Sequence, residues 1–116
     1  LNARVRALVL ALNRLPGIEV GCARNQDDGD PFGLWFDVLN FHARGLLTLS
    51  RLLSANYHGH QQYFRIKLDH KDTEPQVCFL LESTGVGDPW IKAQDLADEV
   101  NAHVDRRVKS YNILYG

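Results

Sequence analysis

The chain has no methionine, only two cysteines and no long hydrophobic run. Because no window approaches the ~20 apolar residues of a membrane-spanning helix, we expect no membrane partner. Cys22 and Cys78 cannot supply a dense disulfide framework, and each falls within an apolar run, as buried free thiols do. A Cys22–Cys78 bridge would require adjacent strands. The missing initiator leads us to expect a longer or trimmed natural chain, and the lack of a signal-peptide pattern predicts a cytoplasmic location.

An excess of charge of one sign is also lacking. The 13 basic and 14 acidic residues leave a net charge of −1 at pH 7. That balance creates no overall field to recruit nucleic acid, so a nucleic-acid partner is disfavoured, although a local basic patch stays an open alternative. A chain of 116 residues that is 45% hydrophobic and 23% charged has the size and composition of one globular domain. We expect a single domain over residues 1–110 and a short apolar tail over 111–116.

Hydrophobic periodicity predicts seven elements. An amphipathic helix begins at the N-cap Asn2 and ends at Pro16-Gly17, and a second helix is capped by Asn40. The last helix begins at Asp88-Pro89, with Asp as the cap and Pro at the first helical position. Alternating stretches predict strands over 18–22, 34–38, 63–69 and 77–82. The order α-β-β-α-β-β-α predicts an α+β fold with a mostly antiparallel four-stranded sheet and helices on one face.

The other face of this sheet is predicted to be open. Alternation directs Phe36, Ile66 and Phe79 toward the helices and places their neighbours on the opposite face. The candidate binding residues on the open face are Trp35, Tyr63, Arg65 and Lys67. Aromatic and basic side chains on one sheet face are chemically similar to the stacking platforms of single-stranded RNA binders. The same face also carries Glu19, Asp37 and Glu82, which repel phosphates, so cross-strand salt bridges beneath solvent or a second copy explain it better.

A polar loop between the first two strands forms a second candidate site. Its residues are Cys22, Arg24, Asp27, Asp28 and Asp30. The acidic run lacks the regular spacing and closing Glu of a calcium loop, so a polar hairpin tip explains it better. His58 and His60 lack the third and fourth ligands that zinc needs, which predicts solvated loop histidines. We therefore expect no metal and no cofactor.

Residues 5–38 carry a resemblance. Leu8 to Leu15, then Pro16-Gly17-Ile18-Glu19-Val20-Gly21-Cys22, then Trp35-Phe36-Asp37-Val38, resemble a class of small bacterial and phage domains in which a strand delivers a Cys after a Leu-Pro-Gly turn. The arrangement is also similar to the start of the wybutosine-synthesis methyltransferase-like family, whose strand ends in Ser-Cys-Ser-Gly-Arg. Cys22 matches that motif, whereas Gly21, Ala23 and Arg24 depart from it. The resemblance implies an RNA-linked or nucleotide-linked ancestry.

Two functions are compatible with these patterns. The first is a non-enzymatic binding or assembly module that uses the open sheet face and forms a homodimer, because Trp35, Tyr63 and Leu80 share a face that no helix need cover. The alternative is a small RNA- or nucleotide-linked modifying enzyme with its site at Cys22 and the 23–32 loop. No nucleophile has a sequence-defined base beside it, so whether the chain is an enzyme stays undecided.

Overall fold

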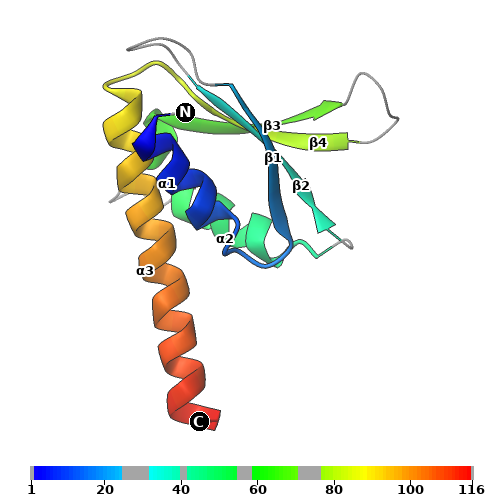
Figure 1. Cartoon of the computed structure of the whole chain (residues 1–116), viewed down its shortest axis with the longest axis vertical. Coiled ribbons are helices and arrows are strands. Elements are labelled where there is room, and N and C mark those ends of the chain that lie inside the picture. The colour runs from blue at the N-terminus through cyan, green and yellow to red at the C-terminus, as the bar shows by residue number, and fades with distance from the viewer. Residues whose placement is uncertain (1, 25–31, 40–41, 55–58, 71–76, 116) are drawn as a thin grey trace.

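The computed structural model of the chain describes residues 2–24, 32–39, 42–54, 59–70 and 77–115. In chain order its elements are α1 (Ala3–Leu12), β1 (Ile18–Arg24), β2 (Gly33–Val38), α2 (Arg44–Ser54), the 3-10 helix η2 (His60–Gln62), β3 (Phe64–His70), β4 (Val77–Ser83) and α3 (Pro89–Tyr115). This order confirms the predicted α+β class (Figure 1). No helix within the described ranges is long and apolar enough to cross a bilayer.

Side-chain caps confirm two of the predicted helix starts. The backbone N–H of Arg4 donates to Asn2 Oδ1 at 2.8 Å, and that of Trp90 donates to Asp88 Oδ1 at 2.9 Å. Each carboxamide or carboxylate oxygen satisfies a backbone donor that the first helical turn leaves unpaired. The third expected cap, Asn40, lies outside the described residues.

The strands form one antiparallel sheet in the order β1-β2-β4-β3. Consecutive strands pair as two hairpins, β1 with β2 and β3 with β4, and β2 pairs with β4 to join them, so β1 and β3 are the edges. Because β2 separates β1 from β4, Cys22 and Cys78 do not lie on neighbouring strands. Neither forms a disulfide bond.

All three α-helices pack on one face of this sheet (Figure 1). Leu34 and Phe36 of β2 are almost fully buried beneath them, and Phe79 of β4 stacks on Phe36 with 5.5 Å between ring centroids. The helices contribute buried side chains to the same core: Val5, Leu8, Ala11, Leu12, Leu49, Leu53, Ala93, Leu96, Ala97 and Val100. The predicted assignment of the two sheet faces is therefore confirmed for the central strands.

A bulge in β1 overturns the predicted orientation of Cys22. Val20 lies opposite Phe36, but the register then shifts, so that Cys22 lies opposite Trp35. One extra residue at Gly21 turns the next side chain to the other face of the sheet. Strict alternation predicted a buried Cys22 beside Val20, and this prediction is wrong because Cys22 is exposed.

The helix α3 extends well beyond the body of the domain (Figure 1). Its 27 residues span about 40 Å at the usual rise of ~1.5 Å per residue. Side chains as far as Val100 are buried in the core, whereas those of residues 105–114 are exposed. The expected separate tail at 111–116 is helical through Tyr115. The helix continues because neither Gly nor Pro interrupts residues 90–115.

Candidate functional site

The predicted open face is covered by its own side chains. Trp35 lies opposite Leu80 of β4, and its indole N–H donates to Asp69 Oδ2 of β3 at 2.9 Å. Because β4 separates β2 from β3, the indole must cross β4 to make this bond. Leu80 and Cys78, on the same face of β4, are accordingly only 4% and 3% exposed. The apolar patch available on this face is therefore smaller than the sequence pattern predicts.

The hydrogen bond from Trp35 also acts on the titration of Asp69. The indole N–H, followed by the backbone N–H of His70 at 2.9 Å, holds the pKa of the Asp69 carboxyl below its usual value. Both donors stabilise the ionised form, so the open face carries a carboxylate that accepts two hydrogen bonds.

The basic residues of the open face surround one buried carboxylate. Glu82 Oε1 lies 2.7 Å from Arg65 Nε and 3.0 Å from Lys67 Nζ, and its Oε2 lies 3.9 Å from a terminal nitrogen of Arg24. The Glu82 side chain is 10% exposed, so its charge depends on these partners. Arg65 and Lys67 are thus paired within the sheet, in the cross-strand salt bridges that the sequence favoured over phosphate binding.

The structure brings two of the loop candidates onto this same face. Cys22 lies opposite Trp35, and the Arg24 guanidinium lies 5.5 Å from the Trp35 ring centroid, in the position of a cation–π contact. The other loop candidates, Asp27, Asp28 and Asp30, lie outside the described residues.

The fourth open-face candidate lies elsewhere. Tyr63 precedes β3 and packs against the first turns of α3, with Lys92 Nζ 4.1 Å from its ring centroid. His58 lies outside the described residues, and His60 is 4% exposed beside Phe64, so the prediction of a solvated loop histidine is wrong for His60. Among the described residues, no group of three or more His, Cys, Asp or Glu side chains is placed to hold a metal ion.

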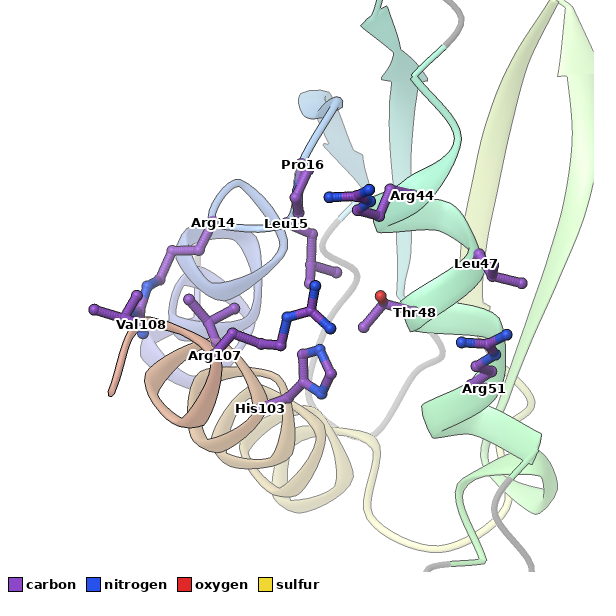
Figure 2. A pocket seen from close by; sticks show the side chains of 11 residues that line it. Arg14, Leu15, Pro16, Arg44, Leu47, Thr48, Arg51, His103, Arg107 and Val108 are labelled. Carbon is purple, nitrogen blue, oxygen red and sulfur yellow. The ribbon is translucent and has the colours of Figure 1, made fainter. Parts of the chain in front are cut away.

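A second candidate site lies on the helical side of the sheet. A cleft of about 440 Å³ opens between α2 and α3 at the end of α1. We call it the arginine cleft, and its lining is Arg14, Leu15, Pro16, Arg44, Leu47, Thr48, Arg51, His103, Val104, Arg107 and Val108. Figure 2 shows that Arg107 and His103 of α3 and Thr48 of α2 point into the space between the two helices. The lining contains four arginines and no carboxylate.

A tight turn after α1 fixes the start of α2 at one end of the cleft. The N–H of Gly45, in the first turn of α2, donates to the carbonyl oxygen of Pro16 at 3.0 Å. A Cβ at Gly45 would overlap that oxygen, so only glycine permits this approach. Gly17, with φ of +82°, takes the left-handed conformation that lets the chain leave the turn into β1. The Leu-Pro-Gly sequence therefore positions Arg44, the residue before Gly45, at the rim.

One arginine of the cleft is neutralised and three are not. Arg14 binds Asp105 at 2.7 Å and Asn101 at 2.8 Å, and so ties the end of α1 to α3. Within the described part of the chain, Arg44, Arg51 and Arg107 form no ion pair with a carboxylate.

Burial and two neighbouring arginines act on the histidine of the cleft. Partial burial, then the neighbouring Arg107 and Arg106, lower the pKa of His103 below its usual value. Arg107 also lines the cleft, so an anion that offsets its charge should raise this pKa.

Sequence reasoning missed this site because its residues come from separate segments, α1, α2 and α3, none of which carries a motif. One local signal was present. Arg44 is the first residue of α2, where the helix dipole disfavours a cation. A base at that position does not stabilise the helix, which suggests another role.

Comparison with known proteins gives no further assignment: no family model matches the chain, and neither a curated protein nor a solved structure is similar to it.

Proposed function

We propose that this domain is a non-enzymatic binding module that holds a phosphate-bearing anion in the arginine cleft. One observation carries the proposal: four arginines and a histidine line a concave site that has no carboxylate in its lining. Arg44, Arg51 and Arg107 are exposed and have no carboxylate partner among the described residues, and like charges held close together repel one another. An anion that enters the cleft relieves this repulsion and gains hydrogen bonds.

The residue types favour phosphate. Arginine presents a planar fork of donors that matches a phosphate or carboxylate in bidentate fashion, and no lysine lines the cleft. The Thr48 hydroxyl adds a donor from α2, and Leu15, Leu47 and Val104 supply apolar walls. Three charge-assisted contacts of about 2 kcal/mol each, reduced by about 0.5 kcal/mol for each ordered side chain, leave about 4.5 kcal/mol, so we expect dissociation constants on the order of hundreds of micromolar to millimolar.

The cleft is better suited to binding than to catalysis. Its lining includes neither a thiol nor a carboxylate, and His103 is its only side chain that titrates near neutral pH. A nucleophile, a base and a group that orients the base are thus not assembled there. The Cys22 hypothesis concerns the opposite face of the sheet, and the open-face interface and the homodimer likewise stay predictions.

Titration with pyrophosphate, followed by arginine side-chain and backbone NMR signals, tests the proposal. We expect saturable shifts at Arg44, Thr48 and Arg107, and at least a tenfold loss of affinity in the variant Arg44→Gln/Arg107→Gln. The matched control is Arg4→Gln/Arg6→Gln, which removes the same charge from exposed positions of α1 outside the cleft.

Equal losses in the two variants, or no saturation in the millimolar range, would reject the arginine cleft as the site. S-adenosylmethionine in a parallel titration addresses the enzyme alternative. Shifts confined to Cys22 and Arg24 with that ligand would favour the alternative over the binding module.

A further inference from the structure

The arginine cleft does not end at the body of the domain. Two adjoining hollows follow the projecting part of α3: one shares Arg107 and Val108 with the cleft and adds Tyr111. The other shares Arg14 and Val108 and adds Lys109 and Asp105, the carboxylate that pairs with Arg14. The Tyr111 side chain is 63% exposed there. A ligand longer than one phosphate group therefore has a continuous surface to follow from α2 onto the end of α3.

Charge is distributed along α3 in the same direction. In its first half, which is bound to the domain, the acids Asp95, Asp98 and Glu99 outnumber the one base Lys92, whereas in the projecting half the bases Arg106, Arg107 and Lys109 outnumber the one acid Asp105. The two halves of α3 therefore differ in the sign of their charge. A polyanion responds to the local potential of the basic half and not to the net charge of the chain.

We infer that the natural ligand is a single-stranded nucleic acid, with phosphates in the arginine cleft and a base stacked on Tyr111. The inference rests on the proposed function and names its ligand. Arg107 and Tyr111 are four residues apart, about 6 Å along the helix axis, which is on the scale of one extended nucleotide. Arginines that follow a backbone, next to an aromatic ring that is open to solvent, are the combination that binds single strands.

The shape of the site separates this ligand from its nearest competitors. A cleft of about 440 Å³ has the size that holds one small-molecule unit, such as a nucleotide. A duplex carries its phosphates on a convex surface, so they cannot reach the bottom of the arginine cleft. Its bases are stacked internally and are not available to Tyr111. An acidic peptide has carboxylates for the arginines but no ring system for the tyrosine and for the apolar walls at Leu47 and Val104.

Fluorescence anisotropy with a short labelled single strand, made once as RNA and once as DNA, tests the inference. We expect binding of at least one of them, with log affinity falling against log salt at a slope of about −2, as three neutralised phosphates require. Tyr111→Ala should weaken strand binding roughly tenfold and leave pyrophosphate binding unchanged, while Tyr111→Phe keeps the affinity because the ring carries the contact. Tyr111 is exposed, and unchanged melting temperatures of both variants verify the fold. The ratio of RNA to DNA affinity then identifies which of the two strands is the better ligand.

Three results would overturn the inference while leaving the proposed function intact. The first is pyrophosphate binding in the cleft without strand binding. The second is competition by polyglutamate or by duplex DNA as effective as that by the unlabelled strand. Loss of both pyrophosphate and strand binding would instead remove the proposed function itself. A strand that binds equally well to Tyr111→Ala would also overturn the stacking role of this residue, and with it the named ligand.

Discussion

Two regions of this molecule carry basic side chains on opposite sides of one sheet, and their electrostatic states differ. On the open face, Arg65 and Lys67 lie within 3.0 Å of the buried carboxylate of Glu82. In the arginine cleft, Arg44, Arg51 and Arg107 have no carboxylate partner among the described residues. The open face is internally neutralised, whereas the cleft is left with uncompensated positive charge.

The comparison teaches that residue type alone does not identify an anion site. Antiparallel pairing places Arg65 directly opposite Glu82, so complementary charges meet within the sheet. In the cleft, helices of separate sequence origin bring like charges together, and nothing in the lining balances them. The first arrangement pairs its charges within the fold, and the second leaves the positive charge that we propose binds an anion.

The largest expected loss of stability comes from a substitution that disturbs the arginine cleft and leaves the open face unchanged. In Gly45→Ala the new Cβ would overlap the Pro16 carbonyl oxygen, so the start of α2 must shift. We expect a loss of about 2 kcal/mol in the free energy of unfolding, measured by urea denaturation. Gly21→Ala is the matched control, because no atom lies within 4 Å of the added Cβ there. A Gly45→Ala variant as stable as Gly21→Ala would show that the turn does not brace the cleft.

The next effect compares the two sets of charges directly. Arg65→Gln/Lys67→Gln leaves Glu82 with only the 3.9 Å contact to Arg24, and we expect a loss of about 1.5 kcal/mol at low salt. The paired variant Arg44→Gln/Arg51→Gln should change stability by less than about 0.5 kcal/mol, because it removes no ion pair of the described chain. Equal losses in the two variants would contradict the difference drawn between the two regions.

A smaller effect concerns the indole that covers β4. Trp35→Phe removes the 2.9 Å hydrogen bond to Asp69 and a ring long enough to span the strand, at a cost of about 1 kcal/mol. Cys78 is 3% exposed when Trp35 is present. In a Cys22→Ser background, Trp35→Phe should therefore accelerate maleimide labelling of Cys78 several-fold. Trp90→Phe serves as the control, because the buried Trp90 indole nitrogen has no hydrogen-bond partner in the described structure. Unchanged Cys78 labelling would mean that another group covers this thiol.

The smallest effects are pH dependences. Folding lowers the pKa of His103, so the unfolded chain binds more protons, and this contribution to stability falls as the pH drops through the unperturbed value of 6.5. Folding also lowers the pKa of Asp69, whose contribution is lost only as the pH falls below 3.8. NMR titration of His103 should show its pKa rising when pyrophosphate fills the cleft. A pKa that is the same with and without ligand would place the anion away from His103.

Local patterns accounted for much of the fold. The caps at Asn2 and Asp88 and the two hairpins involve residues close in sequence, so propensity and alternation were enough to predict them. The predictions were wrong where one extra residue shifts a strand register and where no helix-breaking residue ends a helix. The bulge at Gly21 reversed Cys22, and the helix ran through the expected tail to Tyr115. His60 is buried beside Phe64. Alternation places Phe64 in the core, but it does not predict which side chains pack around it.

The sequence by itself determined the order of the elements, their start signals and which sheet face the helices cover, because these depend on contacts within a few residues and on hydrophobic period. Only the tertiary structure decided the electrostatics. Arg44 and Arg107 are 63 positions apart, yet both line one cleft, while Glu82 and Arg65 pair across two strands. Coulomb energy depends on distance in space and on the surrounding dielectric, and neither can be read from a near-neutral total charge. The uncompensated arginines therefore emerge only when α1, α2 and α3 pack together.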